Sequence, residues 1–148
     1  KLQTFVPIQD YQIDHYKNRF LKYINPGFIK CVTDENDELV AFAITMPSFS
    51  NALKKINGKV DLIGKLRLLH AKNFNHKGSL YLIGVRPDFQ NKGVIAILFN
   101  ELQKFYNKFG ITEVETNPEL IENTAIQQLW KNYENNQHKN RATFTKEI

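Results

Sequence analysis

Apolar residues recur with two different spacings in the first part of the chain, and the spacing predicts which segments are helices and which are strands. Residues 10–24 carry aromatic and aliphatic side chains at helical spacing, and the Asn-Pro-Gly turn that follows ends that helix. The runs 28–33 and 39–46 are rich in strand-forming residues and are separated by Asp and Asn residues that favour turns. These two runs therefore predict an antiparallel β-hairpin.

A second helical region follows Pro47. Residues 51–73 return to helical spacing, and we expect a short helix followed by a longer, basic one. An apolar strip on a helix normally faces the core, so we expect the strip of the longer helix to pack on the edge of the sheet. Alternatively, this basic helix covers the acceptor cleft, contacts a membrane surface or faces another domain. The strip consists of Leu62, Ile63, Leu66 and Leu69.

The second half of the chain contains the most apolar segment. The run 78–85 is apolar on both faces, which is typical of a central strand covered on both sides. A long amphipathic helix is predicted over residues 94–109, with Gly110 in the position of a C-terminal cap. Further along we expect a strand at 111–116, a helix over 124–135 that begins after Asn123, and a closing strand at 141–148.

These elements predict a mixed α/β (α+β) fold: a twisted sheet flanked by helices. With 148 residues, of which 42% are apolar, the chain has enough material for one domain over residues 1–148, with a helical insertion at about 51–77. No apolar run approaches the roughly 20 residues that a bilayer requires, so we expect no membrane span. Cys31 is the only cysteine, which excludes an internal disulfide and favours the cytoplasm.

The charge of the chain bears on its partners. Its net charge of +5 is a modest surplus that indicates an anionic ligand. We expect no nucleic-acid partner, because no segment interleaves aromatic and basic residues and no binding module is recognisable. We also expect no metal, because the histidines are scattered without the spacing of a metal site or a hydrolase triad. They are His15, His70, His76 and His138.

The turn between the central strand and the long helix is the strongest candidate for chemistry. The sequence GVRPDFQNKG, residues 84–93, joins the two apolar segments. The first amides of a helix lack partners within the helix and lie at the positive end of its dipole, which favours phosphate. The chain has no GxGxxG and no GxxxxGK[ST] motif. The alternative is that Gly93 only eases a tight turn between strand and helix.

The same string resembles the signature V-x-P-x-x-[QR]-x-x-G-x-[GA] of the acyl-CoA-dependent N-acetyltransferase superfamily, GNAT, at Val85, Pro87, Gln90 and Gly93. The later segment NTAIQQLWKNY is also similar to the family, and the resemblance covers residues 28–148 apart from the insertion. The resemblance implies acetyl-CoA, or another acyl-CoA, as co-substrate. It implies cofactor contacts at Gly84, Val85, Gln90, Asn91, Lys92, Gly93, Val94, Ile95, Asn123 and Trp130.

Two positions depart from the family pattern. Ile95 stands where the family usually has glycine or alanine, and Trp130 aligns with the tyrosine that commonly protonates the departing thiolate. Tyr133, one helical turn later, is then the candidate acid, with core packing as the alternative for both aromatic residues. The resemblance also implies a glutamate as general base: Glu115 is the candidate, and Glu113 on the same strand face and Glu119 and Glu122 in the following loop are the alternatives. Solvation at the surface is the alternative for each of these acids.

The resemblance implies an N-acyltransferase that transfers acetyl from acetyl-CoA to a small-molecule amine acceptor. The alternative is a non-catalytic or CoA-binding domain of the same fold with an interaction or regulatory role. Only one helical pattern precedes the hairpin, so we expect the chain to lack the family's opening strand and one helix. We then expect a fragment of a longer chain, in which an upstream domain precedes Lys1.

Overall fold

The chain forms two compact units, Lys1–Glu115 and Thr116–Ile148, and each is described by itself. The computed structural model describes residues 7–19, 25–58 and 60–146. Ahead of the hairpin it shows the helix α1 (Asp10–Arg19) and the short 3₁₀ helix η2 (Pro26–Phe28). We predicted that no strand precedes the first helix, where residues 1–6 lie. We also predicted that this helix continues through residues 20–24. Both segments lie outside the described residues.

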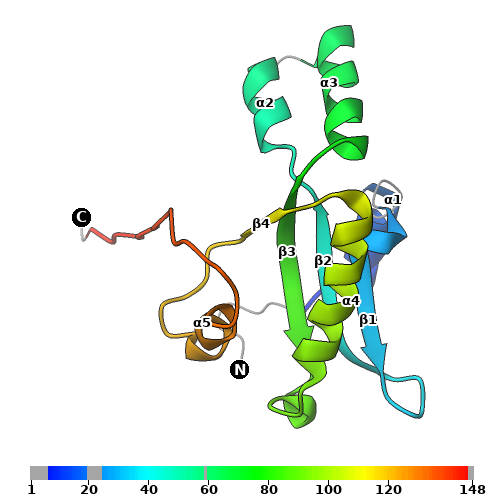
Figure 1. Ribbon diagram of the computed structural model, residues 1–148, viewed down its shortest axis with the longest axis vertical. Coiled ribbons are helices and arrows are strands. Elements are labelled where there is room, and N and C mark those ends of the chain that lie inside the picture. The colour runs from blue at the N-terminus through cyan, green and yellow to red at the C-terminus, as the bar shows by residue number, and fades with distance from the viewer. Residues whose placement is uncertain (1–6, 20–24, 59, 147–148) are drawn as a thin grey trace. The chain divides into compact units, whose positions relative to one another are not determined.

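Four strands form one sheet in the order β1-β2-β3-β4, which confirms the mixed α+β class (Figure 1). The strands β1 (Ile29–Thr33) and β2 (Leu39–Pro47) form the predicted antiparallel hairpin, and β3 (Lys77–Val85) pairs antiparallel with β2. The helix α4 (Val94–Phe109) connects β3 to β4 (Glu113–Thr116). The strand β3 is therefore interior, as its apolar sequence predicts.

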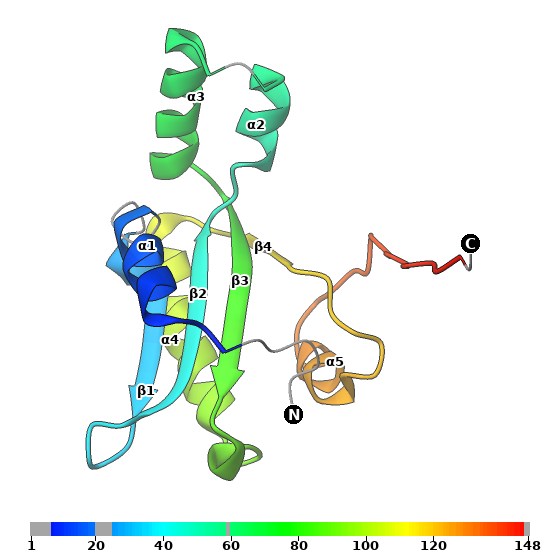
Figure 2. The same ribbon diagram turned by 180° about the vertical axis from the view of Figure 1, so that it is seen from behind.

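The core lies between the sheet and α4. Figures 1 and 2 show α4 on one face of β1 and β2, and α1 on the opposite face. Val94, Leu98 and Leu102 of α4 are buried, and they meet the strand face that carries Ala41 and Ala43. Their spacing of four residues is that of one helix face, so the amphipathic pattern of α4 explains how it covers the sheet. No described helix is long and apolar enough to cross a membrane.

One end of α4 is anchored by aromatic packing. The rings of Phe28, Phe105 and Phe109 form a cluster with centroid distances of 4.8, 5.8 and 4.4 Å. The buried hydroxyl of Thr45 donates to the Phe28 carbonyl at 2.8 Å. Tyr106 forms a hydrogen bond with the same threonine, and burial raises the pKa of its phenol.

The helices α2 (Ser50–Ile56) and α3 (Leu62–Asn73) occupy the predicted insertion and extend beyond the ends of β2 and β3 (Figure 1). The prediction that the apolar strip of α3 packs on the sheet edge is wrong. The opposite side of α3 is the packed one, where Gly64 is buried and Leu68 is half-buried. Exposed fractions are 75% for Leu62, 59% for Ile63, 59% for Leu66 and 55% for Leu69.

The second unit contains the helix α5 (Thr124–Trp130), which is shorter than the predicted helix over 124–135. The side-chain amide of Asn135 donates to the carbonyls of Trp130 and Tyr133 at 2.8 and 2.9 Å. This asparagine offers the last carbonyls a partner outside the helix, which explains the earlier end. The predicted closing strand is also wrong for residues 141–146, which form no strand. Its central apolar residue, Phe144, is 88% exposed and has no core face to cover.

Candidate functional site

The turn between β3 and α4 has a backbone that directs amides outward. The 3₁₀ helix η3 (Pro87–Phe89) follows β3, and Asn91 and Gly93 then adopt left-handed φ values of 60° and 76°. Such turns form concave arrays of backbone N–H groups that suit anions. The 16-residue helix α4 begins directly after Gly93, which is its N-cap. The N–H groups of the turn and the positive end of the α4 dipole therefore meet at residues 91–95.

The amides at the start of α4 are available to a ligand. The Gly93 carbonyl accepts from the amides of Ala96 and Ile97 at 3.0 and 3.3 Å, so the amides of Val94 and Ile95 precede the first bonds of the helix. A Cβ atom added at Gly93 would meet nothing within 4 Å. The side chain of Ile95 therefore lies more than 4 Å from that position, although it is bulkier than the family's usual residue.

Arg86 fixes the start of the turn to the β-hairpin. Its guanidinium pairs with Asp88 at 2.9 Å, Asp34 at 3.2 Å and Glu38 at 3.3 Å, and it stacks 4.5 Å from the ring centroid of Phe89. Hydrogen bonds to backbone amides and to Arg86 lower the pKa of Asp34. The sequence reasoning missed this residue, although the acidic hairpin turn DENDE and the R-P-D segment together signal such a cluster.

The polar side chains of the turn lie at its surface. The Lys92 ammonium lies 5.1 Å from the centroid of the Phe89 ring, and Gln90 reaches the Val85 carbonyl at 3.5 Å. Of the predicted cofactor residues from Gly84 to Ile95, Gln90, Asn91, Lys92 and Gly93 are exposed, whereas Val94 is buried and Val85 packs against the buried core.

The strand β3 is interrupted before it reaches the turn. Its register against β2 shifts between Ile44 and Thr45, which leaves Tyr81 as the additional residue of a β-bulge. Gly84 lies opposite Phe42, whose ring would be 2.6 Å from a Cβ atom added at that glycine. Gly84 therefore has a packing role that the family motif does not reveal.

The strand β4 covers only the beginning of β3. Its pairing begins where the His76 carbonyl accepts from the amides of Thr112 and Glu113 at 2.8 and 3.2 Å. With four residues in β4 against nine in β3, β4 is too short to follow β3 to its end at Val85. Within the described part of the chain, the last residues of β3 thus have a strand neighbour on the β2 side alone.

The two candidate bases on β4 differ. The Glu113 carboxylate forms an ion pair with Lys77 at 2.5 Å, which lowers the pKa of Glu113. Glu115 is half-buried, whereas Glu113 is exposed. An ion-paired carboxylate with a lowered pKa is a weaker base, so Glu115 is the better candidate on this strand.

The remaining predicted residues lie in the second unit. Asn123 is the N-cap of α5, although among the described contacts its side chain makes no capping hydrogen bond. The indole N–H of Trp130 donates to the Glu119 carboxylate at 2.7 Å. The Tyr133 ring packs edge-on against Trp130 with centroids 6.3 Å apart, and Tyr133 is 39% exposed. Core burial is therefore not the role of Tyr133 in this unit.

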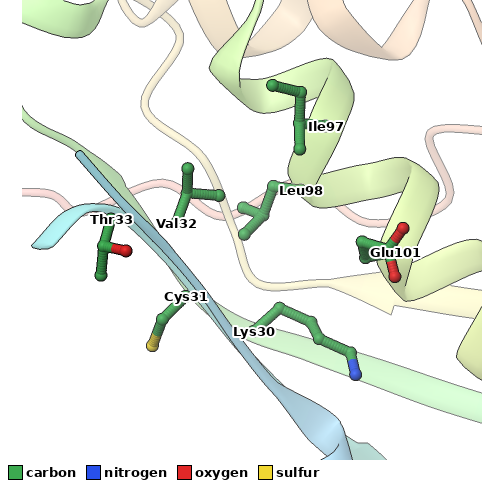
Figure 3. A pocket seen from close by; sticks show the side chains of 7 residues that line it. All are labelled: Lys30, Cys31, Val32, Thr33, Ile97, Leu98 and Glu101. Atoms are coloured by element: carbon green, nitrogen blue, oxygen red, sulfur yellow. The ribbon is translucent and has the colours of Figure 1, made fainter. Parts of the chain in front are cut away.

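A separate pocket of about 430 Å³ lies between β1 and α4 (Figure 3). Val32 and Leu98 point toward one another across it, whereas Cys31 and Thr33 point away from the helix. Lys30 and Glu101 supply the charged groups of the pocket lining. Sequence reasoning gave no indication of this pocket, because its residues come from two elements without a shared motif.

The model of the Acetyltransferase (GNAT) family matches residues 3–133. No curated protein matches the chain. The aminoglycoside 6'-N-acetyltransferase AAC(6')-IG from Acinetobacter haemolyticus has a similar fold, with a TM-score of 0.58 and 14% identity over 95% of this chain and 83% of that one.

Two further solved structures share this fold. AAC(6')-Ih from Acinetobacter baumannii has a TM-score of 0.55 at 13% identity, over 96% of this chain and 83% of that one. AAC(6')-Iy, in complex with the bisubstrate analogue CoA-S-monomethyl-acetylneamine, has a TM-score of 0.55 at 15% identity. It is matched over 95% of this chain and 82% of its own. At these identities the likeness establishes the fold.

Proposed function

We propose that this chain, which belongs to the GNAT acetyltransferase family, transfers the acetyl group of acetyl-CoA to the primary amine of a small-molecule acceptor in the cytoplasm. The observation that carries the proposal is the turn before α4, where outward amides and an open Gly93 meet at a helix N-terminus. A solved relative of the same fold is a complex with CoA. Family membership favours an enzyme over the non-catalytic alternative.

The residues of the turn suit the pyrophosphate of CoA. The amides of residues 91–95 would donate to phosphate oxygens, and Lys92 would add a mobile cation. Because an added Cβ at Gly93 would project into open space, the backbone here can be approached closely. Arg86 takes no part in this contact, since its guanidinium is engaged by three carboxylates. It is a positioning residue that holds the turn against the hairpin.

The end of β3 suits the pantetheine arm. The strand beyond the Tyr81 bulge has no β4 partner to compete for its backbone groups at Gly84 and Val85, among the described strands. An extended amide-containing arm can then pair with it as a further strand would. Bound here, acetyl-CoA supplies an activated acyl group, and backbone amides of β3 would polarise its carbonyl.

Proton transfer requires one base and one acid. The acceptor nitrogen must lose a proton as its bond to the acetyl carbon forms, and the departing thiolate must gain one. We assign Glu115 as the base, because it is half-buried on β4, whereas Glu113 is exposed and paired with Lys77. We assign Tyr133 as the acid, because a phenol delivers a proton near neutral pH far more readily than the indole of Trp130. Approximation of the two substrates supplies the rest of the acceleration.

We infer the class of acceptor from the solved proteins that share this fold. Solved proteins of this fold include N-acetyltransferases whose acceptors are aminoglycosides. We extend to this chain only the shared chemistry, a small molecule with a primary amine. The test is release of the CoA thiol from acetyl-CoA with a panel of amino sugars, amino acids and polyamines. Acetylation of at least one amine supports the proposal, and binding of acetyl-CoA without transfer to any amine favours the non-catalytic alternative.

Matched variants test the two assignments. Glu115→Gln should lower kcat by about 10²-fold or more, whereas Glu113→Gln on the same strand should leave kcat nearly unchanged. Tyr133→Phe should lower kcat similarly, whereas Tyr11→Phe should leave kcat nearly unchanged. Equal effects within either pair would overturn that assignment and leave the transfer reaction itself in place.

A further inference from the structure

The helix α3 presents an exposed leucine stripe, defined as Leu62, Leu66 and Leu69. The three residues follow the i, i+4, i+7 spacing of one helix face, and each is more than half exposed. Leu53 of the neighbouring helix and Phe74 just after α3 are exposed as well, by 53% and 73%. Single exposed apolar residues are common at protein surfaces, but several on one short segment mark an interaction site.

The stripe lies opposite the face that holds α3 in place. Gly64 is buried and Leu68 is half-buried, and both lie about half a turn from the stripe at roughly 100° per residue. Ala52 and Ile56 supply the buried residues of α2. The helix thus has two apolar faces, of which one packs within the protein and the other meets solvent. Nothing in the packing of the first unit needs the second face.

The helical pair is rigidly constructed. The Asp61 carboxylate caps α3 by accepting from the Gly64 amide at 2.7 Å. The Arg67 guanidinium donates to the Lys55 carbonyl at the end of α2, at 3.0 Å. The first bond caps α3 and the second links α3 to α2, so the leucine stripe lies on a formed helix that is attached to its neighbour.

The net positive charge of the chain is concentrated on this pair. Residues 50–74 contain six lysine and arginine residues against one aspartate, a net charge of +5, which equals the net charge of the whole chain. The remaining residues therefore sum to zero, and the surplus positive charge is local to residues 50–74. Lys65 and Lys72 flank one side of the leucine stripe by helical geometry, and His70 flanks the other.

We propose that the α2–α3 pair binds the surface of an anionic phospholipid bilayer through the leucine stripe and the basic residues that flank it. Leucines between lysines are the composition by which amphipathic helices lie in the membrane interface, where cations meet lipid phosphates and apolar side chains enter the acyl boundary. The pair projects from the sheet end opposite the η3 turn, since Pro47 pairs with Gly78 there and Ala41 with Val85 at the other end (Figure 1). The surface can therefore dock without covering the turn.

Charge separates this partner from a second copy of the chain. In a symmetric dimer through the leucine stripe, the basic flanks of one copy would face those of the other, which is unfavourable. A bilayer with anionic headgroups meets the same flanks with opposite charge. A membrane also accepts long lysine and arginine side chains, whose stems lie along apolar groups while their charges stay at the headgroups.

The test is co-sedimentation of the full chain with vesicles of phosphatidylcholine and phosphatidylglycerol, compared with pure phosphatidylcholine. The variant is Leu66→Ser with Leu69→Ser, and its matched control is Leu39→Ser with Ile121→Ser, which removes two exposed apolar residues elsewhere. Circular dichroism and the melting temperature of each variant establish that it is folded. Size-exclusion chromatography with light scattering gives the oligomeric state.

We expect binding to the anionic vesicles alone, weakened by salt. The leucine variant should bind on the order of 100-fold more weakly, at about tenfold for each leucine withdrawn, whereas the control should bind as the wild type does. Equal binding of both variants overturns the proposal, as does absence of binding to anionic vesicles. A dimer that the leucine variant dissolves would show that a second copy covers the stripe and would also overturn it.

Discussion

Two glycines at opposite ends of α4 allow the phosphate contact to be separated from helix stability. Gly93 and Gly110 have φ values of +76° and +68°, and a Cβ atom added at either would meet nothing within 4 Å. Alanine at either position must adopt a left-handed backbone, which costs roughly 1–2 kcal/mol. Gly93→Ala and Gly110→Ala should therefore lower the melting temperature by similar amounts.

The two variants should differ in acetyl-CoA binding. A methyl group at Gly93 occupies the space through which a phosphate oxygen approaches the amides, whereas Gly110 lies at the carboxyl end of the same helix. Loss of one hydrogen bond to a charged group costs about 1.5–3 kcal/mol. At about 1.4 kcal/mol per decade, the Kd of Gly93→Ala should rise roughly 10- to 150-fold. The Kd of Gly110→Ala should stay within about twofold of the wild type.

Isothermal titration calorimetry gives the Kd of each variant, and differential scanning fluorimetry gives its melting temperature. The two variants serve as controls for one another, because they share the backbone cost. An unchanged Kd for Gly93→Ala would refute the reasoning, and so would an equal rise in both variants.

Three further outcomes follow from named contacts. Lys92→Ala should raise the Kd for acetyl-CoA only a few-fold in calorimetry, because the backbone amides remain; complete loss of binding would contradict this. Tyr106→Phe should lose about 1 kcal/mol of stability at neutral pH with its bond to Thr45. Burial raises the pKa of Tyr106 above 10.0, so as the pH rises past that value the phenol ionises more readily in the unfolded chain and the wild type loses stability. The difference in stability between the wild type and Tyr106→Phe should therefore narrow at alkaline pH, as thermal melts would show. Gly84→Ala should destabilise by about 1–3 kcal/mol, and adding Phe42→Leu should recover part of this; no recovery would reject the ring contact.

The sequence predicts most accurately where the local pattern and the packing agree. The hairpin, β3 and α4 form where the apolar spacing predicts them, and the amphipathic pattern of α4 buries Leu98 and Leu102. Gly110 ends α4 as its sequence position predicts. The turn from Gln90 to Gly93 could also be predicted, because its motif lies within ten consecutive residues and does not depend on contacts with distant parts of the sequence.

Prediction failed where the partner of a pattern is distant or missing. Alternation at 141–146 resembles a strand, but Phe144 finds no face to cover. The strip on α3 resembles a core face, but Gly64 permits the opposite face to pack instead. The ion pairs of Arg86 were not predicted, because its carboxylate partners Asp34 and Glu38 are 52 and 48 residues away in sequence. Long-range pairs of this kind leave only a weak trace in local spacing.

Amide chemical shifts during titration with acetyl-CoA test the central claim most directly. In ¹H–¹⁵N correlation spectra of the labelled chain, we expect the largest changes at residues 91–95, with smaller ones at Gly84 and Val85. The amide chemical shift of Gly110 should not change. Changes confined to the β1–α4 pocket around Val32 and Leu98, or none at millimolar acetyl-CoA, would contradict a cofactor site at the start of α4.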